Sequence, residues 1–229
     1  MSIRIEALHG FLGRPKDWEI LSEIPYHAVD LFHDYPIVPL REWAEAFTAP
    51  SKRVLLGYSL GGRLALHALI RHPADWDAAI FVSTHPGLYS KEERQKRLEA
   101  DYRWAERFEN DSWDSLMDAW NAQSVFCNSL EGSAHLLERC ESDYQRPLLA
   151  SALRNWSLGT QEDLRERLSE LEIPILWMVG ENDTKYRELA LNIRLKHPLS
   201  RIVLVANSGH RIPWEQPQFF LSTVKQFSA

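Results

Sequence analysis

Ser59 has the sequence surroundings of a reactive residue. It stands at the centre of a G-x-S-x-G pattern, residues 57–61, between an apolar run at residues 53–56 and a helical pattern at residues 64–70. A serine at such a strand-to-helix turn is held in a strained conformation with its hydroxyl clear of the sheet. The hydroxyl becomes a useful base or nucleophile when a neutral imidazole can take its proton. The pattern therefore predicts a reactive serine; the alternative is an ordinary turn that happens to contain serine.

Two partners for this serine follow later in the chain, each directly after a predicted strand. Asp183 comes after the apolar run at residues 173–180, and His210 comes after the next strand. Active sites in open α/β sheets form beyond the carboxyl ends of the strands. The order Ser, Asp, His is that of the α/β-hydrolase fold. We therefore predict a triad in which Asp183 orients His210, with Glu181 as a rival carboxylate and a surface loop as the alternative position of His210.

An H-G-x-x-G loop at residues 9–13 follows the first predicted strand, residues 3–8. In this fold an early loop supplies one backbone N–H of an oxyanion hole, and the residue after the nucleophile supplies the other. We expect these two donors to be the amides of Phe11 and Leu60. Leu60 also begins a predicted helix, which adds a helix N-terminus to the anion site.

Predicted strands and helices alternate at both ends of the chain, which is typical of a mainly parallel sheet with helices on both faces. The predicted strands span residues 3–8, 26–31, 53–58, 78–83, 173–180 and 201–205, and the predicted helices span residues 40–47, 62–71, 162–170, 186–196 and 216–227. We predict an α/β-hydrolase fold whose core comprises residues 1–85 and 160–229.

The alternation stops between residues 86 and 159, where helix formers and charged residues dominate. Helices are predicted over residues 91–108, 114–121, 133–141 and 147–155. We predict that this segment is a helical lid inserted between two strands. It contains Trp104, Trp113, Trp120 and Trp156, which either line an apolar pocket or attach the lid to the core.

Arg63 lies four residues after Ser59, one turn into the predicted helix. A guanidinium there suits a substrate that carries carboxylates, because it forms bidentate charge-assisted hydrogen bonds; an exposed helix arginine is the alternative. Arg97 in the lid has a similar alternative as the partner of Glu93 on a solvated helix face, a pair that contributes only ~0.2–0.5 kcal/mol.

Composition limits the remaining classes. The chain has 229 residues, 45% of them hydrophobic, and a formal net charge of −6 without a basic stripe, which argues against nucleic acid as a partner. It has no signal-peptide pattern and no apolar run near the ~18 residues of a membrane span, so we expect a cytoplasmic protein without membrane partners. Cys127 and Cys140 lack metal-ligand spacing and are expected to be reduced packing residues.

Several narrower motifs resemble the 2-succinyl-6-hydroxy-2,4-cyclohexadiene-1-carboxylate synthase family of menaquinone biosynthesis, and the resemblance runs nearly from end to end. The segments that carry it are L-H-G-F-L-G at residues 8–13, G-Y-S-L-G-G-R at residues 57–63, H-P-G-L at residues 85–88, W-A-E-R-F at residues 104–108, G-E-N-D-T-K-Y at residues 180–186 and G-H at residues 209–210. The elbow and triad are shared with many hydrolases, whereas the H-P-G-L, W-A-x-R-F and G-E-x-D-x-K segments are narrower.

The resemblance implies a lyase that eliminates pyruvate from a polycarboxylate substrate, with Ser59 acting as a base. It implies substrate contacts for Tyr58, Arg63, Arg97 and Trp120. It also implies a further substrate arginine late in the lid, for which three candidates remain open: Arg139, Arg146 and Arg154. No metal or organic cofactor is expected, and we expect a monomer.

Two alternatives remain. A serine carboxylesterase or thioesterase would use the same triad through an acyl-enzyme, and it would have no use for Arg63 and Arg97. A catalytically silent protein of the same fold would bind a ligand without chemistry, which the intact set of Ser59, Asp183 and His210 disfavours.

Overall fold

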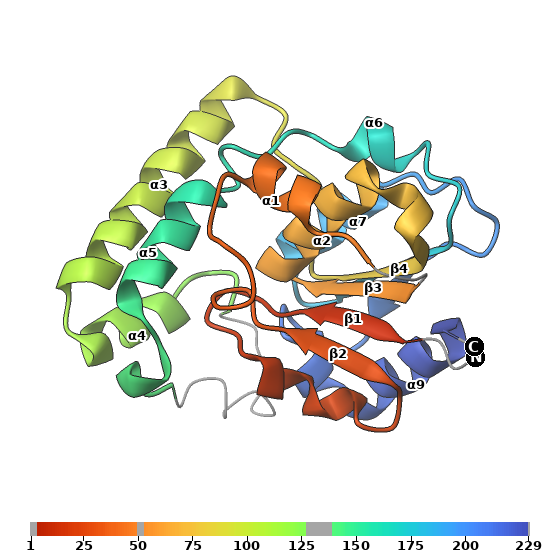
Figure 1. The fold of residues 1–229 in the computed structure, drawn as a ribbon, viewed down its shortest axis with the longest axis horizontal. Coiled ribbons are helices and arrows are strands. Elements are labelled where there is room, and N and C mark those ends of the chain that lie inside the picture. The colour runs from red at the N-terminus through yellow and green to blue at the C-terminus, as the bar shows by residue number, and fades with distance from the viewer. Residues whose placement is uncertain (1–3, 50–52, 127–138, 229) are drawn as a thin grey trace.

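The computed structural model describes residues 4–49, 53–126 and 139–228. Its described strands form one parallel sheet in the order β2-β1-β3-β4-β5-β6, with helices on both faces (Figure 1). The strands are β1 Ile5–Leu8, β2 Tyr26–Val29, β3 Arg53–Tyr58, β4 Trp76–Val82, β5 Ile175–Gly180 and β6 Arg201–Val205. This architecture confirms the predicted α/β-hydrolase fold.

The helices that cover the sheet belong to the two ends of the chain. They are α1 Leu40–Ala46, α2 Leu60–Arg71, α6 Arg165–Leu168, α7 Thr184–Leu191, α8 Ile212–Glu215 and α9 Pro217–Ser228, with short 3-10 helices η1 Pro15–Leu21 and η2 Pro73–Asp75. In Figure 1, α1 and α2 lie above the sheet and α9 lies below it. The helix predicted at residues 162–170 is reduced to the four residues of α6, and the helix predicted at residues 186–196 is instead α7, Thr184–Leu191. The sequence pattern did not predict η1 or α8.

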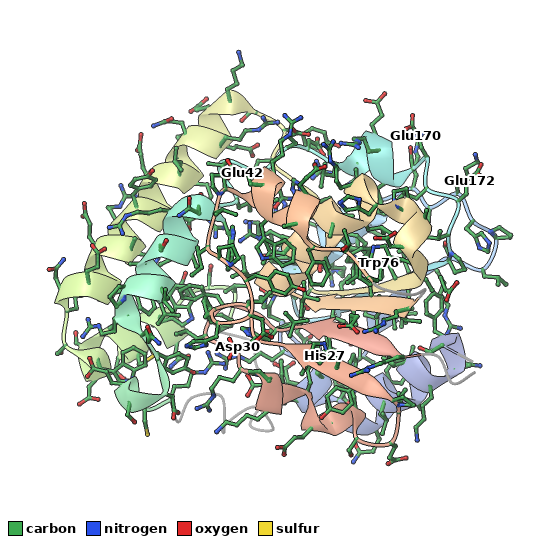
Figure 2. All side chains as sticks on the ribbon, in the orientation of Figure 1. His27, Asp30, Glu42, Trp76, Glu170 and Glu172 are labelled. Atoms are coloured by element: carbon green, nitrogen blue, oxygen red, sulfur yellow. The ribbon has the colours of Figure 1, made fainter. Side chains whose placement is uncertain are left out.

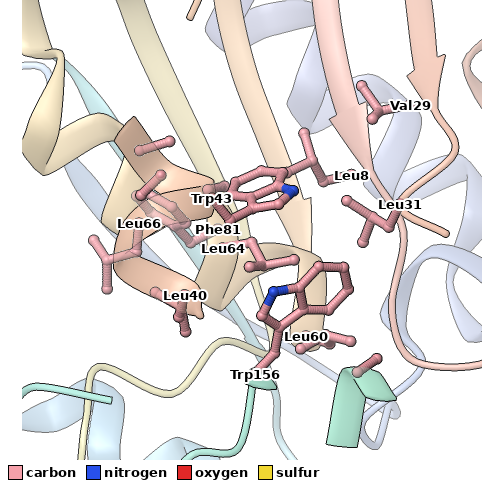
Figure 3. Packing of buried hydrophobic residues seen from close by; sticks show 14 of the residues in the cluster. Leu8, Val29, Leu31, Leu40, Trp43, Leu60, Leu64, Leu66, Phe81 and Trp156 are labelled. Atoms are coloured by element: carbon pink, nitrogen blue, oxygen red, sulfur yellow. The ribbon is translucent and has the colours of Figure 1, made fainter. Parts of the chain in front are cut away.

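The core layer beneath α1 and α2 is rich in aromatic side chains. Trp43 of α1 stacks on Phe47 with ring centroids 4.7 Å apart, and Phe47 stacks on Trp76 at 5.9 Å. Figure 3 shows Trp43 and Leu64 of α2 against Phe81 of β4. This apolar layer fixes α2 on the sheet and so fixes the position at which that helix begins.

The opposite face of the sheet packs against η1 and α9. Leu56 of β3 and Ile80 of β4 belong to a buried cluster with Trp18 of η1 and Phe220 of α9. The Trp18 and Phe220 rings stack 6.3 Å apart. The four central strands β1, β3, β4 and β5 are buried on both faces, as expected for a parallel sheet, whereas the edge strands β2 and β6 are partly exposed.

The helices between β4 and α6 stand beside the sheet rather than on it (Figure 1). They are α3 Lys91–Asn110, α4 Trp113–Asn121, the 3-10 helix η4 Glu141–Asp143 and α5 Arg146–Asn155. Most of the helix predicted at residues 133–141 lies outside the described residues. The division into core and lid at residues 86 and 159 stays a prediction.

The long helix α3 is fixed at its first turn and along its length. Ser90 accepts a hydrogen bond from the amide of Glu93 at 3.0 Å, and the Glu93 carboxylate accepts one from the amide of Ser90 at 3.3 Å. This capping box fixes the N-terminus of α3. Farther along, Arg154 of α5 donates to both carboxylate oxygens of Glu109, at 2.6 and 2.7 Å, so α5 is tied to α3.

Charged side chains lie around the outside of the molecule, and Figure 2 shows Glu42, Glu170 and Glu172 pointing away from the body. Among the described helices, none combines the length and the apolar character needed to cross a membrane. Cys140 is exposed, so the prediction that it is a packing residue is wrong, and Cys127 lies outside the described residues.

Candidate active site

Ser59 occupies a strained position between β3 and α2. Its backbone has φ 52° and ψ −110°, which a residue with a side chain rarely adopts. Its amide donates to the carbonyl of Val82 at 3.0 Å, which ties the turn to the end of β4. A Cβ at Gly61 would come within 2.3 Å of the carbonyl oxygen of His9, so only glycine allows α2 to begin this close to the loop after β1.

The three predicted triad residues are brought together at the carboxyl ends of β3, β5 and β6. Nε2 of His210 lies 3.0 Å from Oγ of Ser59, and Nδ1 of His210 lies 2.6 Å from Oδ2 of Asp183. The side chains of His210 and Asp183 are 2% and 4% exposed. This is the arrangement in which a carboxylate orients an imidazole toward a hydroxyl.

Glu181, the rival carboxylate, points elsewhere. Its Oε2 accepts a hydrogen bond from the amide of Asn207 at 3.2 Å. It therefore stabilises the loop that leads to His210, whereas Asp183 makes the hydrogen bond to the imidazole itself.

His9 holds the loop after β1. Its Nε2 accepts a hydrogen bond from the amide of Leu31 at 3.1 Å, so the ring proton is on Nδ1, which donates to the carbonyl of Gly10 at 2.8 Å. Burial lowers the pKa of His9, which keeps the ring neutral. Within the described part of the chain the amides of Phe11 and Leu60 donate no hydrogen bond, and both residues line the same pocket as Ser59. Both amides are thus available to a developing negative charge.

A pocket of about 480 Å³ opens beside Ser59 and His210, between the sheet and the lid helices. Its charged and polar lining comes from α2, α3 and the start of α7, and its apolar lining comes from the loop after β1, α4 and α5. The residues that the sequence predicted and that line it are Phe11, Ser59, Leu60, Arg63, Arg97, Trp120, Asp183 and His210. A volume of this size holds a small organic ligand.

Arg63 lies on the wall of this pocket and is only 9% exposed. Its Nη1 donates to the carbonyl of Trp156 at 2.8 Å and to Oε1 of Gln161 at 3.4 Å. Burial, with a smaller contribution from the nearby Arg97, lowers the pKa of Arg63 to about 10. The guanidinium still carries its charge at neutral pH, and it lacks a carboxylate partner within the described residues. An anionic ligand would supply that partner.

Arg97 faces the same pocket from α3. Its Nε donates to both carboxylate oxygens of Asp101, at 2.8 and 2.9 Å, so the pairing with Glu93 that we considered is wrong. Asp101 is 3% exposed and also accepts a hydrogen bond from Ser157 at 2.7 Å. Because this bonding uses only Nε of Arg97, the terminal guanidinium nitrogens are left for a ligand.

Aromatic rings form the apolar wall. Trp120 lies against Phe11 with ring centroids 4.8 Å apart and against Trp104 at 5.0 Å. Trp156 is buried and donates from Nε1 to the carbonyl of Val38 at 2.9 Å. Trp120 and Trp156 line the pocket, and Trp156 also joins the end of α5 to the segment before α1.

Tyr58 lies on the other side of Ser59, in a small crevice that also contains Arg139. Its ring packs on Trp214 at 5.0 Å and lies 5.7 Å from the imidazole of His210. Burial raises the pKa of Tyr58, so the phenol is protonated at neutral pH. It can therefore donate a hydrogen bond but cannot act as a base.

The three late-lid arginines have different surroundings. Arg146 donates to the carbonyls of Phe108 and Asp111, each at 2.5 Å, and so closes the end of α3. Arg154 forms an ion pair with Glu109. Arg139, in contrast, reaches the carbonyl of Phe11 at 3.4 Å and lies in the crevice beside Tyr58 and Ser59. Among the three candidates, Arg139 is the one next to the triad.

Sequence reasoning assigned no role to several residues that line the pocket. Lys185 and Tyr186 follow Asp183 at the start of α7, and the Tyr186 ring lies 4.6 Å from that of His210. Both belong to the G-E-N-D-T-K-Y segment, so their motif was a usable signal. Phe126, with its ring 5.9 Å from that of His210, had no comparable signal. The described residues contain no group of three or more His, Cys, Asp or Glu that could hold a metal ion.

Comparisons with known proteins agree with this geometry. A profile described as "Alpha/beta hydrolase family" matches residues 7–223. Among solved structures, MenH from S. aureus superposes with a TM-score of 0.83 at 21% identity, covering 98% of this chain and 92% of that one. An esterase from Thermogutta terrifontis superposes with a TM-score of 0.75 at 19% identity, covering 99% of this chain and 89% of that one. These likenesses define the fold class.

Sequence relatives are more specific. The 2-succinyl-6-hydroxy-2,4-cyclohexadiene-1-carboxylate synthases of Salmonella arizonae and Salmonella paratyphi C are each 30% identical to this chain over 96% of its length and 91% of theirs. The chain therefore belongs to the alpha/beta hydrolase family and, within it, to the family of 2-succinyl-6-hydroxy-2,4-cyclohexadiene-1-carboxylate synthases.

Proposed function

We propose that this protein is a lyase that eliminates pyruvate from 2-succinyl-5-enolpyruvyl-6-hydroxy-3-cyclohexene-1-carboxylate and forms 2-succinyl-6-hydroxy-2,4-cyclohexadiene-1-carboxylate. The observation that carries the proposal is the cationic pocket beside Ser59. Three positively charged side chains line the same pocket as Ser59: Arg63, Arg97 and Lys185. A substrate with several carboxylates fits such a lining, and a neutral ester has no use for it.

The proposed reaction begins with removal of a ring proton. Ser59 takes the proton from carbon while its own hydroxyl proton moves to Nε2 of His210, 3.0 Å away. The ring then forms its second double bond as the bond to the enolpyruvyl oxygen breaks. The leaving enolate gains one proton and becomes pyruvate, and this proton balances the one that His210 gives up to return to its neutral form. No water is consumed and no acyl-enzyme forms.

The surrounding groups have separate roles in this scheme. Asp183 holds the imidazole in the tautomer that accepts the serine proton and stabilises the imidazolium that results. The amides of Phe11 and Leu60 donate to the negative charge that develops as the proton leaves, each contributing about 3 kcal/mol by the measure of known oxyanion donors. Arg63 and Arg97 bind the carboxylates and orient the ring over Ser59.

An esterase is the second candidate, and the specific observation in its favour is the fold itself. The Thermogutta terrifontis esterase shares the fold of this chain at a TM-score of 0.75. The same triad performs ester hydrolysis when the serine attacks a carbonyl and water releases the acyl group. The two reactions differ in whether water is consumed, so they can be separated directly.

The deciding experiment assays the purified wild-type protein with two substrates in parallel, one for elimination and one for ester hydrolysis. The enolpyruvyl substrate, generated in situ, is followed by pyruvate release and by diene absorbance, and a p-nitrophenyl ester is followed by nitrophenolate release. Rapid elimination with negligible ester cleavage supports the lyase. Rapid ester cleavage with elimination at the uncatalysed rate would show that the protein is an esterase.

A further inference from the structure

A second cavity of about 460 Å³ adjoins the pocket beside Ser59. We call it the outer chamber. It lies between the loop after β4, the first turn of α3, α6 and α7. Its aromatic and charged lining includes His85, Tyr89, Glu93, Lys96, Arg165 and Lys185. Arg97, Leu158 and Lys185 line both cavities, so the two spaces share a wall.

Arg165 is the unusual member of this lining. Its side chain is 9% exposed, and no described residue accepts a hydrogen bond from its Nε or Nη2. The guanidinium lies 3.9 Å from the centre of the Tyr89 ring, and Nη1 is 2.8 Å from a carboxylate oxygen of Asp163. The Tyr89 ring and the Asp163 carboxylate thus hold the guanidinium through its face and its Nη1, and its Nε and Nη2 positions remain unused.

Two further donors reach the chamber from other elements. Lys185 makes no hydrogen bond or ion pair within the part of the chain that the structure describes. His85 accepts a hydrogen bond at Nδ1 from the amide of Gly87 at 3.1 Å, so its proton is on Nε2, for which the described residues provide no acceptor. Burial and the nearby cations, Lys185 first among them, lower the pKa of His85 to about 2, so the ring is a neutral donor.

The acidic groups of this region are already engaged. Glu93 is held in the capping box of α3, and Glu92 outside the chamber pairs with Lys96 at 2.7 Å. Within the described residues, the lining therefore offers unused donors on three elements, and its one carboxylate, that of Glu93, is held at the start of α3 by the amide of Ser90. A planar anion with two oxygen acceptors matches this arrangement.

We propose that the outer chamber is a second carboxylate subsite, in which Arg165, Lys185 and His85 bind one carboxylate group of the incoming substrate or of the three-carbon product that leaves. The identity of these two ligands, the enolpyruvyl substrate and pyruvate, rests on the proposed function. The carboxylate chemistry of the chamber itself does not depend on it. Because Arg97 and Lys185 line both cavities, a carboxylate can pass from one chamber to the other while remaining next to a positive charge.

The test measures pyruvate binding to the resting protein by calorimetry, with the neutral amide pyruvamide as the ligand control. Three variants are compared with the wild type: Arg165→Met, Arg165→Lys and Arg194→Met, the last at an exposed arginine outside both cavities. Loss of one charge-assisted hydrogen bond weakens pyruvate binding about tenfold in Arg165→Met. The Arg165→Lys variant should lose less, and Arg194→Met should bind as the wild type does.

Turnover separates the two sources of the carboxylate. A higher KM in Arg165→Met with unchanged kcat shows that the chamber holds the substrate, whereas a higher inhibition constant for pyruvate alone shows that it holds the product. Equal pyruvate affinity in Arg165→Met and the wild type would overturn the proposal, as would an equal loss in Arg194→Met. Absence of elimination by the wild type would overturn the proposed function instead, and the calorimetric comparison would still decide the subsite. If Arg165→Met fails to fold, Arg165→Lys carries the same comparison.

Discussion

The single Nε–H of Arg97 donates a three-centre hydrogen bond to the two carboxylate oxygens of Asp101, at 2.8 and 2.9 Å, one turn along the same helix. Ser157 donates a further hydrogen bond to Asp101 at 2.7 Å from the segment after α5. This buried carboxylate holds Arg97 through its Nε atom. Arg97 lines the pocket, and its two terminal guanidinium nitrogens have no hydrogen-bond partner within the described residues. Asp101 therefore acts as a positioning residue for a cation that we assign to substrate binding.

The first prediction concerns this pair. Asp101→Asn removes the charge that holds Arg97, and we expect KM to rise about tenfold while kcat falls by less than threefold. The control is Asp111→Asn, which breaks the comparable pair between Asp111 and Arg107, at 2.7 Å on the same helix but outside the pocket. Steady-state kinetics decide the matter: similar KM values in the two variants would contradict the positioning role.

The second prediction concerns the two arginines themselves. Arg63→Met and Arg97→Met each remove one charge-assisted contact to a substrate carboxylate, and each should lower kcat/KM about 10- to 100-fold. Arg187→Met is a suitable control, because Arg187 is outside the pocket and its guanidinium donates to the carbonyl of Glu181, at 3.1 Å. Turnover of the polycarboxylate that survived both substitutions would show that these guanidinium groups do not bind it.

The third prediction concerns Tyr58, whose pKa is raised by burial. The phenol acts only as a hydrogen-bond donor near Ser59, so Tyr58→Phe keeps the packing on Trp214 and loses the donor. We expect kcat/KM to fall about tenfold while the free energy of unfolding changes by less than about 1 kcal/mol. Urea unfolding and kinetics on the same preparation provide the measurement, and full activity in Tyr58→Phe would rule out a substrate contact by the hydroxyl.

The fourth prediction concerns acid stability. Burial lowers the pKa values of His9, His67 and His85, to about 3 for His67 and about 2 for His85. The folded pKa is lower than the unfolded one, so the unfolded chain binds more protons as the pH falls below about 6.5. The stability is therefore complete above that pH and is lost on acidification, by up to about 1.4 kcal/mol per pH unit for each histidine.

Urea unfolding at pH 7.5, 6.5 and 5.5 measures this slope. His67→Gln removes one titrating group and should flatten it, while His197→Gln, at a partly exposed position, should leave it as in the wild type. A free energy of unfolding that stayed constant from pH 7.5 to 5.5 would show that these rings do not titrate on unfolding.

The catalytic end of the sheet was predictable because local chemistry dictates it. A strained turn needs glycine on both sides of Ser59, and the two partners of Ser59 follow strands directly, so their order along the chain places them at one edge. The parallel sheet followed from apolar runs that alternate with helical patterns. These features depend on a few neighbouring residues, which a sequence displays.

Pairings across the lid were less accessible to sequence reasoning. Arg97 has one acidic residue four positions before it, Glu93, and one four positions after it, Asp101. The packing of α3 on α5 makes Asp101 the hydrogen-bond partner of Arg97. Arg139, Arg146 and Arg154 were equivalent in the sequence, and the carbonyls and carboxylates around them distinguish them. The short α6 and α7 were overestimated because helix formers continue past the point where each helix ends.

Ser59 is the proposed base of the elimination, so its removal should stop pyruvate release. Pyruvate release at saturating enolpyruvyl substrate is measured for the wild type and for Ser59→Ala, which leaves the amides of Phe11 and Leu60 and both arginines in place. We predict that kcat falls at least a thousandfold in Ser59→Ala while the substrate still binds. Pyruvate release at the wild-type rate in Ser59→Ala would contradict it.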